Sequence, residues 1–483
     1  MIESHLLTSL NGYINGQWIP AESGASFDVL NPATGEKLAA VARMGTGETQ
    51  QAIAAAKRAL KPVPSLEQRR AWLNDIHDAL HKEADEIGRI LCMEHGKPLP
   101  EAKGEVAYAA GFFKYCADHI DELQPRELEE QPKNCSWTVH FRPIGVAGLI
   151  VPWNFPIGMI AKKLSAALAA GCPSVIKPAS ETPLTMIALF QLLHEHVDLP
   201  AGMVNLVMGS ASEIGAELCA SPDVPMLSFT GSTGVGKKLI EQTQDQVKKL
   251  GLELGGNAPF IVFEDADLDA AADNLMANKF RGGGQTCVCA NRVYVHSKVY
   301  DAFRSKVVER VQAMQVGNGL EEGVDIGPLI NRQGFDKVRD HVSDALSKGA
   351  ELVAGTHPDE LDSGKDLFYP PTVITGVKHD MACCRDETFG PLVPLISFDD
   401  EDEAIKWANT TEYGLASYIF TGDDERAARV MAQLNFGHCG YNTGTGPTPE
   451  APFGGMKQSG IGREGGLEGL MEYVELQTVP RGF

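Results

Sequence analysis

Short apolar runs alternate with helical segments between residues 145 and 242, and this alternation constrains the fold more than any other feature of the chain. The runs are GVAGLIV (145–151), SVIK (174–177), VNLV (204–207) and MLSF (226–229). The segments between them carry apolar residues at three- and four-residue spacing, which is typical of helices. Strands that alternate with helices form parallel sheets with helices on their faces, so we predict an α/β fold.

Ligands of parallel sheets bind beyond the carboxyl ends of the strands, so the segments directly after these runs are candidates for a binding site. They read PWNFP (152–156), KPAS (177–180), MGSAS (208–212) and TGST (230–233). The last one overlaps GSTGVGKK (231–238), a glycine-rich turn that presents backbone N–H groups and a helix N-terminus to a phosphate. Lys238 stands where a nucleoside triphosphatase needs Ser or Thr for Mg²⁺, so the pyrophosphate of a dinucleotide is the better ligand.

A second set of apolar runs predicts a second α/β domain. These runs are FIVF (260–263), RVYVH (292–296), LVPLISF (392–398) and SYIF (417–420). Two other segments, CSWTVHF (135–141) and YVELQTV (473–479), alternate polar and apolar residues as half-exposed strands do. Either these two segments pair into a small third element, which invites pairing between subunits, or they are ordinary edge strands.

The charge of the chain excludes several classes of partner. Its 42 basic and 64 acidic side chains give a net charge of −22, which opposes binding to nucleic acid or to an anionic membrane. The most apolar stretches are too short to span a bilayer, and the N-terminus lacks the pattern of a secretory signal. The 10 cysteines are dispersed and include no C-x-x-C, which argues against a disulfide scaffold or a zinc site. We therefore expect a cytoplasmic protein without nucleic-acid, membrane or metal partners.

Two further segments carry residues suited to covalent catalysis. In FRGGGQTCVCANR (280–292), three glycines precede Cys287, so we expect an exposed thiol whose pKa is lowered by nearby N–H groups; a buried core thiol is the alternative. In LELGG (252–256), burial of Glu253 would raise its pKa as a general base requires; a structural ion pair is the alternative. A thiol nucleophile, a carboxylate base and a dinucleotide site together suggest oxidation of an aldehyde through a hemithioacetal and a thioester.

With these motifs in family order, the chain resembles the NAD(P)-dependent aldehyde dehydrogenase superfamily over nearly its whole length. The matching motifs are PWNFP at 152–156, KPASETP at 177–183, FTGSTGVG at 229–236, LELGG at 252–256, FRGGGQTC at 280–287, ETFGP at 387–391 and PFGGMKQSGIGREGG at 452–466. GQTCVCANR and KPAS are most similar to the succinate-semialdehyde and glutarate-semialdehyde dehydrogenases.

The resemblance implies a domain organisation and an assembly. It implies a Rossmann-like cofactor domain (1–122 and 143–251), an α/β catalytic domain (252–451) and a small β oligomerisation arm (123–142 and 465–483). The implied assembly is a homodimer or a homotetramer, and the implied ligands are a small aldehyde and NADP or NAD. Ser180 stands where NAD-preferring enzymes have Glu, and Lys177 adds a cation, so we expect the 2′-phosphate of NADP to be tolerated.

The resemblance also assigns roles to residues at the motif positions. Cys287 is the nucleophile, Glu253 is the general base for deacylation, and the Asn154 amide with the Cys287 backbone N–H forms the oxyanion hole. Their presence argues against a catalytically silent relative. The implied cofactor contacts are Trp153, Gly231 and Ser232 at the pyrophosphate, Lys177 and Ser180 at the adenosine ribose, Glu387 at the nicotinamide ribose, Phe389 near the nicotinamide, and Leu254.

The resemblance is incomplete at the substrate site. Succinate-semialdehyde enzymes hold the substrate carboxylate with two arginines and a serine; Arg281 matches one arginine, Lys162 replaces the other, and the loop 442–451 has no serine. Phe453 is a further implied substrate contact. We expect an ω-carboxylated aldehyde, with succinate semialdehyde first and glutarate or 2-oxoglutarate semialdehyde next. An uncharged aldehyde is the alternative if both cations only neutralise neighbouring carboxylates.

Two positions near Cys287 carry separate questions. The resembling enzymes commonly have Asn at the position of Gly282, and the residues alone do not explain the glycine. Cys289 stands two residues after Cys287, a spacing that in the resembling enzymes is associated with reversible oxidation; the alternative is that Cys289 only packs.

Overall fold

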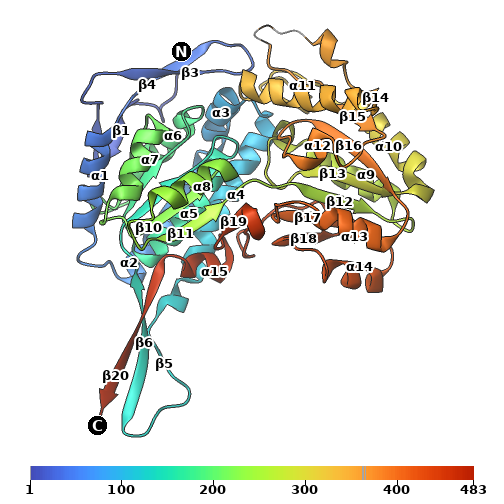
Figure 1. The fold of residues 1–483 in the computed structure, drawn as a ribbon. Coiled ribbons are helices and arrows are strands. Elements are labelled where there is room, and N and C mark those ends of the chain that lie inside the picture. The colour runs from blue at the N-terminus through green and yellow to red at the C-terminus, as the bar shows by residue number, and fades with distance from the viewer. Residues whose placement is uncertain (1, 362–363, 365) are drawn as a thin grey trace.

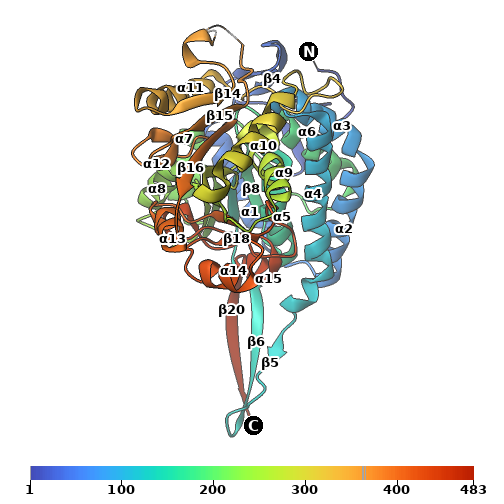
Figure 2. The ribbon, with the colours of Figure 1, turned by 90° about the vertical axis from the view of Figure 1, so that its right-hand side faces the viewer.

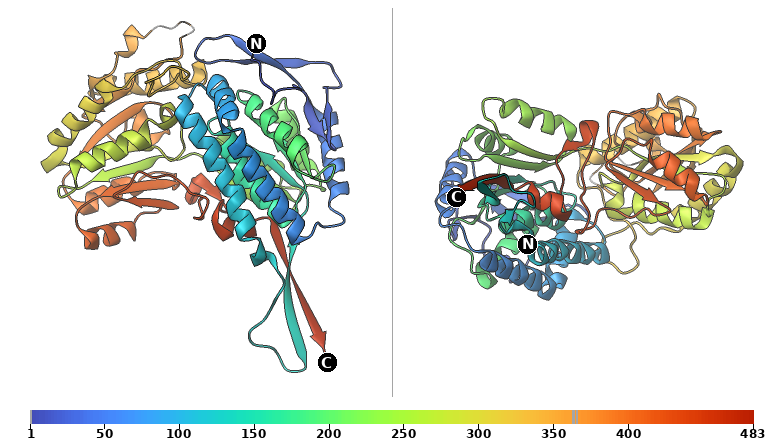
Figure 3. Two further views of the ribbon diagram at one scale, coloured as in Figure 1. Left: turned by 180° about the vertical axis from the view of Figure 1, so that it is seen from behind. Right: turned by 90° about the horizontal axis from the view of Figure 1, so that it is seen from below.

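Two helix-covered sheets and a projecting β-ribbon make up the architecture (Figure 1). The computed structural model describes residues 2–361, 364 and 366–483. The N-terminal half of the chain forms most of the first lobe, and the chain from β12 (Ala258–Val262) onwards forms most of the second. The two lobes lie beside each other (Figure 3, right). The predicted α/β fold is confirmed.

The sheet of the first lobe contains the four strands predicted between residues 145 and 230, and these run parallel to one another. Its strands, in spatial order, are β19 (Gly460–Ile461), β11 (Lys249–Glu253), β10 (Met226–Thr230), β7 (Ala147–Ile150), β8 (Ser174–Lys177), β9 (Val204–Leu206), β1 (Gly12–Ile14) and β2 (Gln17–Ile19). Because the central strands are parallel, their carboxyl ends share one edge of the sheet.

Helices cover both faces of this sheet because its central strands are apolar on both sides. The helices are α1 (Thr46–Ala59), α2 (Leu66–Lys82), α3 (Ala84–His95), α4 (Leu99–Asp118), α5 (Pro156–Ala170), α6 (Pro183–His196), α7 (Ala211–Ala220) and α8 (Thr233–Gln242). Leu149 and Ile176 join a core with α2 to α6, whereas Ile150 and Val175 join a core with α1, α7 and α8. Figure 3 (left) shows α2, α3 and α4 in blue across the back of the lobe.

α5 is the most enclosed of these helices. It starts at Pro156, whose fixed φ suits a first helical turn, and it ends before Gly171, which takes the left-handed φ of 83° that glycine accepts. Every residue of α5 is buried. The loop that precedes α5, which contains PWNFP, therefore rests on a helix that is held from all sides.

The second lobe contains a seven-stranded sheet whose central strands are those predicted from the second set of apolar runs. Its strands, in spatial order, are β14 (Glu351–Ala354), β15 (Thr372–Thr375), β16 (Leu392–Phe398), β13 (Ala290–His296), β12, β17 (Ala416–Phe420) and β18 (His438–Tyr441). β14, β15 and β18 were not predicted, because each is only four residues long and lies beside loops without a marked apolar pattern.

Helices cover both faces of the second sheet as well. They are α9 (Leu268–Lys279), α10 (Tyr300–Ala313), α11 (Arg332–Ser347), α12 (Ala382–Arg385), α13 (Glu401–Asn409) and α14 (Asp424–Met431), while α15 (Gly466–Met471) packs against α5 of the first lobe. The 3₁₀ turns are η1 (Ile120–Leu123), η2 (Arg281–Gly284), η3 (Ser297–Val299), η4 (Pro358–Glu360) and η5 (Lys457–Ser459).

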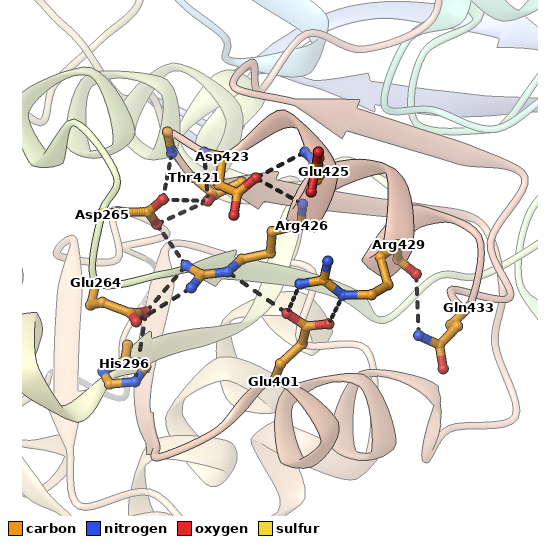
Figure 4. A network of polar contacts seen from close by, with 11 residues as sticks. Glu264, Asp265, His296, Glu401, Thr421, Asp423, Glu425, Arg426, Arg429 and Gln433 are labelled. Carbon is orange, nitrogen blue, oxygen red and sulfur yellow. Dashed lines mark hydrogen bonds and ion pairs between the residues drawn. The ribbon is translucent and has the colours of Figure 1, made fainter.

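A polar network holds the carboxyl ends of the second sheet to its outer helices. Figure 4 shows Arg426 of α14 between Asp265, which follows β12, and Glu401 at the start of α13. The Arg426 guanidinium lies 2.8 Å from the Asp265 carboxylate and 3.7 Å from that of Glu401. Arg429 makes a second contact with Glu401 at 2.7 Å. This edge of the second sheet is therefore occupied by structural ion pairs, and the opposite edge is left for a functional site.

The projecting ribbon pairs two segments that are distant in the sequence (Figure 2). β6 (Cys135–Pro143) runs antiparallel to β20 (Val474–Gly482), and the short β5 (Arg126–Glu127) lies on the other side of β6. The predicted pairing of the two alternating segments is therefore confirmed. A separate two-stranded sheet joins β3 (Ser26–Leu30) and β4 (Lys37–Ala42).

One predicted domain boundary differs from the course of the strands. The boundary between residues 251 and 252 falls inside β11, because pairing with β10 continues through Leu252 and Glu253. The other boundaries stay predictions. Within the described part of the chain, no helix is both long and apolar enough to cross a membrane. The same described residues contain no group of three or more His, Cys, Asp or Glu side chains placed to hold a metal ion.

Candidate active site

A cavity of about 310 Å³ lies where the first lobe meets the second, and its volume is typical of small-molecule sites. The first lobe contributes the carboxyl ends of β7, β10 and β11, and the second lobe contributes the loops that lead into β13 and β16. Opposite edges of the two sheets therefore face one another across it. The predicted site residues in its walls are Trp153, Asn154, Gly231, Ser232, Leu254, Cys287, Glu387 and Phe389.

The loop before Cys287 has a backbone that requires glycine. Gly282, Gly283 and Gly284 have φ values of 59°, 68° and 75°, all in the left-handed region. A Cβ on Gly284 would lie 2.3 Å from the carbonyl oxygen of Gly390, so no side chain fits there. Asn tolerates the left-handed region better than most residues, and a Cβ on Gly282 would meet no atom closer than 3.8 Å, so the backbone at Gly282 has room for either residue. The loop presents Cys287 at the cavity wall.

The expected lowering of the Cys287 pKa is wrong. The residue is half-buried rather than exposed, and burial raises the pKa of the thiol to about 12, with the neighbouring carboxyl of Glu387 adding to the effect. Lys162 acts in the opposite direction but does not cancel the cost of burial. The glycine loop therefore places the thiol at the cavity wall, and burial keeps it protonated at neutral pH.

The Asn154 side chain connects the first lobe to the nucleophile loop. Its amide nitrogen donates a hydrogen bond to the backbone carbonyl of Gln285 at 2.9 Å, two residues before Cys287. The residue is 4% exposed. An amide nitrogen carries two hydrogens, and Gln285 is its acceptor among the described residues, so the second hydrogen is available to a ligand oxygen near Cys287.

Glu253 ends β11 and is 5% exposed. Neither oxygen of its carboxyl group has a hydrogen-bond partner among the described residues, and no ion pair within that part of the chain includes it. Burial raises its pKa well above the usual range, and the carboxylate of Glu464 adds to the effect. The expected direction is confirmed, and the structural ion pair is not found. A carboxyl group with a raised pKa, beside the wall that holds Cys287, is suited to accept a proton from water.

The features at one end of the cavity fit a dinucleotide. α8 starts directly after Gly231 and Ser232, so its N-terminal N–H groups are near the cavity wall, where a pyrophosphate is favoured. Glu387 accepts a hydrogen bond from Gly256 N–H at 3.0 Å, and burial raises its pKa to about 7. The Phe389 ring meets the Trp153 ring edge-on at 5.5 Å, which forms an aromatic wall for a flat ring.

Not every predicted cofactor residue lies in the cavity wall. Lys177 is buried at the end of β8, one strand further from the cavity, where its backbone carbonyl accepts from Val151 N–H at 3.1 Å. Ser180 is exposed on the loop that follows. Burial lowers the pKa of Lys177, although Glu181 opposes this. These two residues border the same sheet edge as the cavity, whereas 208–212 is not among its lining residues.

The predicted substrate residues Lys162, Arg281 and Phe453 are not among the residues that line the cavity, and both cations lie against aromatic rings. The Lys162 ammonium is buried and lies 4.6 Å from the centre of the Phe453 ring, with the rings of Phe112 and Tyr108 also within 6 Å. Burial alone would lower the pKa of Lys162, but the surrounding acidic groups, of which Tyr108 contributes most, raise it. The Arg281 guanidinium lies 5.2 Å from the centre of the Phe155 ring.

The loop 442–451 reaches this second cation. A Cβ on Gly446 would lie 3.1 Å from a guanidinium nitrogen of Arg281, so the loop that lacks the expected serine borders the same space. Neither Lys162 nor Arg281 forms an ion pair with a described acidic residue, although Lys163 on the same helix pairs with Glu464. The alternative in which both cations neutralise neighbouring carboxylates is thus not supported by direct ion pairs, although Glu464 and Glu253 help to raise the pKa of Lys162.

Sequence reasoning missed a buried charged group next to Asn154. Lys97 lies two residues before α4, Glu101 and Glu105 lie in the first two turns of α4, and Lys97 contacts the Asn154 backbone. The available signal was the spacing of Glu101 and Glu105, four residues apart on a helix, which places both carboxyl groups on the face that also carries Tyr108. Charged residues on an apolar helix face are buried only with a partner or a task.

Cys289 is packed rather than exposed. It is 5% exposed, its thiol donates to the carbonyl of Gly284 at 3.3 Å, and the Lys279 ammonium lies 3.7 Å from its sulfur. These contacts are those of a core residue. A redox role for Cys289 stays a prediction.

Comparison with known proteins places the chain among enzymes that oxidise aldehydes. The model of the aldehyde dehydrogenase family matches residues 18–479. Glutarate-semialdehyde dehydrogenase of Pseudomonas putida is 46% identical over 467 residues, which cover 96% of each chain. The NADP(+) succinate-semialdehyde dehydrogenase of Escherichia coli is 46% identical over 466 residues, again 96% of each chain. The crystal structure of an oxidoreductase from Marinobacter aquaeolei has 67% identity and a TM-score of 0.98 over the full length of both chains.

The raised pKa of Cys287 predicts how its alkylation depends on pH. Because the thiolate is the reacting form, the rate of Cys287 modification by iodoacetamide, without added cofactor, should rise about tenfold per pH unit from pH 7 to 9. Peptide mapping by mass spectrometry follows this one thiol. In the urea-unfolded protein the same rate should level off near the ordinary thiol pKa of about 8.5. A folded-state rate that levels off below pH 8 would contradict the burial argument.

Proposed function

The chain belongs to the aldehyde dehydrogenase family, and on that premise we propose that it oxidises an aldehyde with a carboxylate at its far end to the corresponding dicarboxylate. Succinate semialdehyde is the first candidate and glutarate semialdehyde the second, because similar proteins are named for these two substrates. The hydride acceptor is NADP⁺ or NAD⁺.

The observation that carries this proposal is the pair of cations without carboxylate partners. Lys163 and Lys97 each form an ion pair with a glutamate, but no ion pair is found for Lys162 or Arg281 within the described residues. The chain has 64 acidic side chains, so partners are plentiful elsewhere. Neither cation has a carboxylate in direct contact within the described residues, and a substrate carboxylate could form such a charge-assisted contact with them. This supports an anionic substrate that is held against the net charge of −22.

The cofactor end supports a nicotinamide dinucleotide. The start of α8 suits the pyrophosphate, and the Trp153 and Phe389 rings suit a flat ring near Cys287. Position 180 is a serine and not an acidic residue, and the cation Lys177 lies three residues earlier. Both features favour tolerance of the 2′-phosphate of NADP. When bound, the oxidised nicotinamide supplies the hydride acceptor for the reaction.

Covalent catalysis begins at Cys287. The Cys287 thiol first loses its proton to solvent. The resulting thiolate attacks the aldehyde carbon, and the electrons of the C=O π bond move to the carbonyl oxygen, which becomes an oxyanion within reach of the Asn154 amide and the Cys287 backbone N–H. In other enzymes that stabilise an oxyanion with fixed hydrogen-bond donors, each donor lowers the activation barrier by about 3–4 kcal/mol. Loss of the aldehyde hydrogen as hydride leaves a thioester on Cys287, and this step requires the carbon to stay fixed by the loop of three glycines.

Deacylation uses Glu253. A water molecule attacks the thioester carbon while its proton passes to the Glu253 carboxylate, the Asn154 amide again faces the oxyanion, and the thiolate leaves with the carbon–sulfur bond electrons. The raised pKa of Glu253 makes its carboxylate a stronger base than an exposed glutamate. The product is the dicarboxylic acid, and Glu253 must return its proton to solvent before the next cycle.

The projecting ribbon supports assembly into a homodimer or a homotetramer. β20 keeps only its first residue buried, and its Leu476 and Val479 are 61% and 39% exposed, so apolar surface remains uncovered on this element. An uncovered strand pair of this kind favours docking with another copy of the chain. The cysteines, all of which are free thiols in the structure, support a cytoplasmic location.

The role of Glu253 predicts a trapped intermediate. In Glu253→Gln, attack by Cys287 and hydride transfer can still occur, but the base that accepts a proton from the hydrolytic water is lost. The variant mixed with succinate semialdehyde and NADP⁺ should therefore accumulate a thioester on Cys287. Intact-protein mass spectrometry should show the added acyl mass, and it should vanish in Glu253→Gln/Cys287→Ala. Turnover of Glu253→Gln at the wild-type rate would contradict the assignment.

The role of Arg281 predicts a loss that depends on substrate charge. A charge-assisted hydrogen bond is worth about 1.5–3 kcal/mol, so Arg281→Ala should lower kcat/KM for succinate semialdehyde at least tenfold and leave butanal nearly unchanged. Arg304→Ala, at a partly exposed arginine of α10 that pairs with Asp301, is the matched control. An equal loss for both aldehydes would mean that Arg281 supports the loop and does not bind the carboxylate.

A further inference from the structure

A buried ion pair touches the backbone of the oxyanion residue. The Lys97 ammonium lies 2.6 Å from a carboxylate oxygen of Glu105, and both side chains are fully buried. The same ammonium donates to the backbone carbonyl of Asn154 at 2.8 Å and lies 3.9 Å from the centre of the Phe155 ring. Lys97 thus binds the peptide unit that carries the Asn154 side chain.

Glu105 holds the chain on the other side of Asn154. Its second carboxylate oxygen accepts hydrogen bonds from Ile157 N–H and Gly158 N–H, both at 3.1 Å, in the first turn of α5. A carboxylate at a helix N-terminus is stabilised by the unpaired N–H groups there. The ion pair therefore fixes Asn154 through its own carbonyl and through the helix that starts two residues later.

The same end of α4 also reaches the nucleophile loop. Glu101, one helical turn before Glu105, accepts from Gly282 N–H at 2.8 Å. The Gln285 side-chain amide donates a hydrogen bond to the Gly282 carbonyl at 3.0 Å. The Gln285 backbone carbonyl in turn accepts a hydrogen bond from the Asn154 side-chain amide at 2.9 Å. The start of α4 is thus bonded both to the loop that positions the thiol and to the residue that faces the oxyanion.

Stability alone is a weak reason to bury this ion pair. Two buried charges lose hydration that their mutual attraction often fails to repay, and apolar side chains of similar volume often serve stability as well or better. Apolar side chains, however, cannot bond the Asn154 carbonyl or the α5 N–H groups. The contacts that an apolar replacement would lose are those that fix the direction of the Asn154 amide.

We propose that Lys97, with Glu105, is a positioning residue that sets the orientation of the Asn154 amide towards the substrate oxygen. The inference rests on the covalent mechanism of the proposed function and does not depend on the charge of the substrate. Errors of about 1 Å in such placement cost up to about 100-fold in rate. Because the oxyanion forms in both acylation and deacylation, both steps depend on this ion pair.

The test uses the double variant Lys97→Met/Glu105→Gln, which removes the ammonium, leaves no buried charge unpaired and keeps an acceptor for α5. We expect kcat, and the rate of the first-turnover burst of reduced nicotinamide, to fall about 30- to 100-fold. KM for the aldehyde and Kd for NADP⁺ should change less than threefold. The matched control is Lys103→Met, which removes a partly exposed lysine of α4 that pairs with Asp85.

Rates are expressed per folded molecule, with the folded fraction of each variant taken from its urea unfolding curve, which removes any effect of the folded fraction. The loss should be equal for succinate semialdehyde and butanal, so it stays distinguishable from failure of the proposed carboxylate specificity. A lower unfolding temperature with kcat and burst rate per folded molecule within threefold of wild type would overturn the proposal. If the double variant does not fold, Glu105→Gln alone is measured: a loss of at least threefold in both rates supports the proposal, and unchanged rates overturn it.

Discussion

The site depends on the left-handed backbone of the loop before Cys287, which has a position that only glycine can occupy. Three successive left-handed residues, Gly282 to Gly284, press the nucleophile loop against Gly390, with no room for a Cβ at Gly284. This close approach holds together the two loops that lead into β13 and β16, and both loops line the cavity opposite the carboxyl ends of β7, β10 and β11. The first sheet follows the usual rule for ligand binding at carboxyl ends. The second sheet does not, because its carboxyl ends are tied by ion pairs such as that of Arg426 with Asp265.

Burial sets the resting protonation states around the cavity. It raises the pKa of Cys287, of Glu253 and of Glu387, so each of these acids holds its proton to a higher pH than in water. Lys162 stays charged in the same region, because the acidic groups around it outweigh its own burial. Burial thus favours the protonated forms of Cys287 and Glu253, whereas Lys162 keeps its charge beside them.

Much of this arrangement follows from the sequence, and the rest follows from packing. Apolar runs predicted the central strands of both sheets because burial on both faces demands them, and glycine-rich turns marked the loops at Gly231 and Cys287. The sign of the Cys287 pKa shift was missed, since it depends on how deeply the loop is covered by another lobe. Lys97 and Glu105 were missed because their contacts join α4 to residues about 50 positions away, which no local pattern records.

The claim that the two unpaired cations select a carboxylated aldehyde is tested most directly on the wild-type protein. Initial rates of reduced-nicotinamide formation should be measured with succinate semialdehyde, glutarate semialdehyde, butanal and pentanal, each with NADP⁺ and with NAD⁺. The account predicts that kcat/KM for at least one semialdehyde exceeds that for the neutral aldehyde of equal length at least tenfold, or about 1.4 kcal/mol. Equal values for charged and neutral aldehydes of both lengths would contradict it.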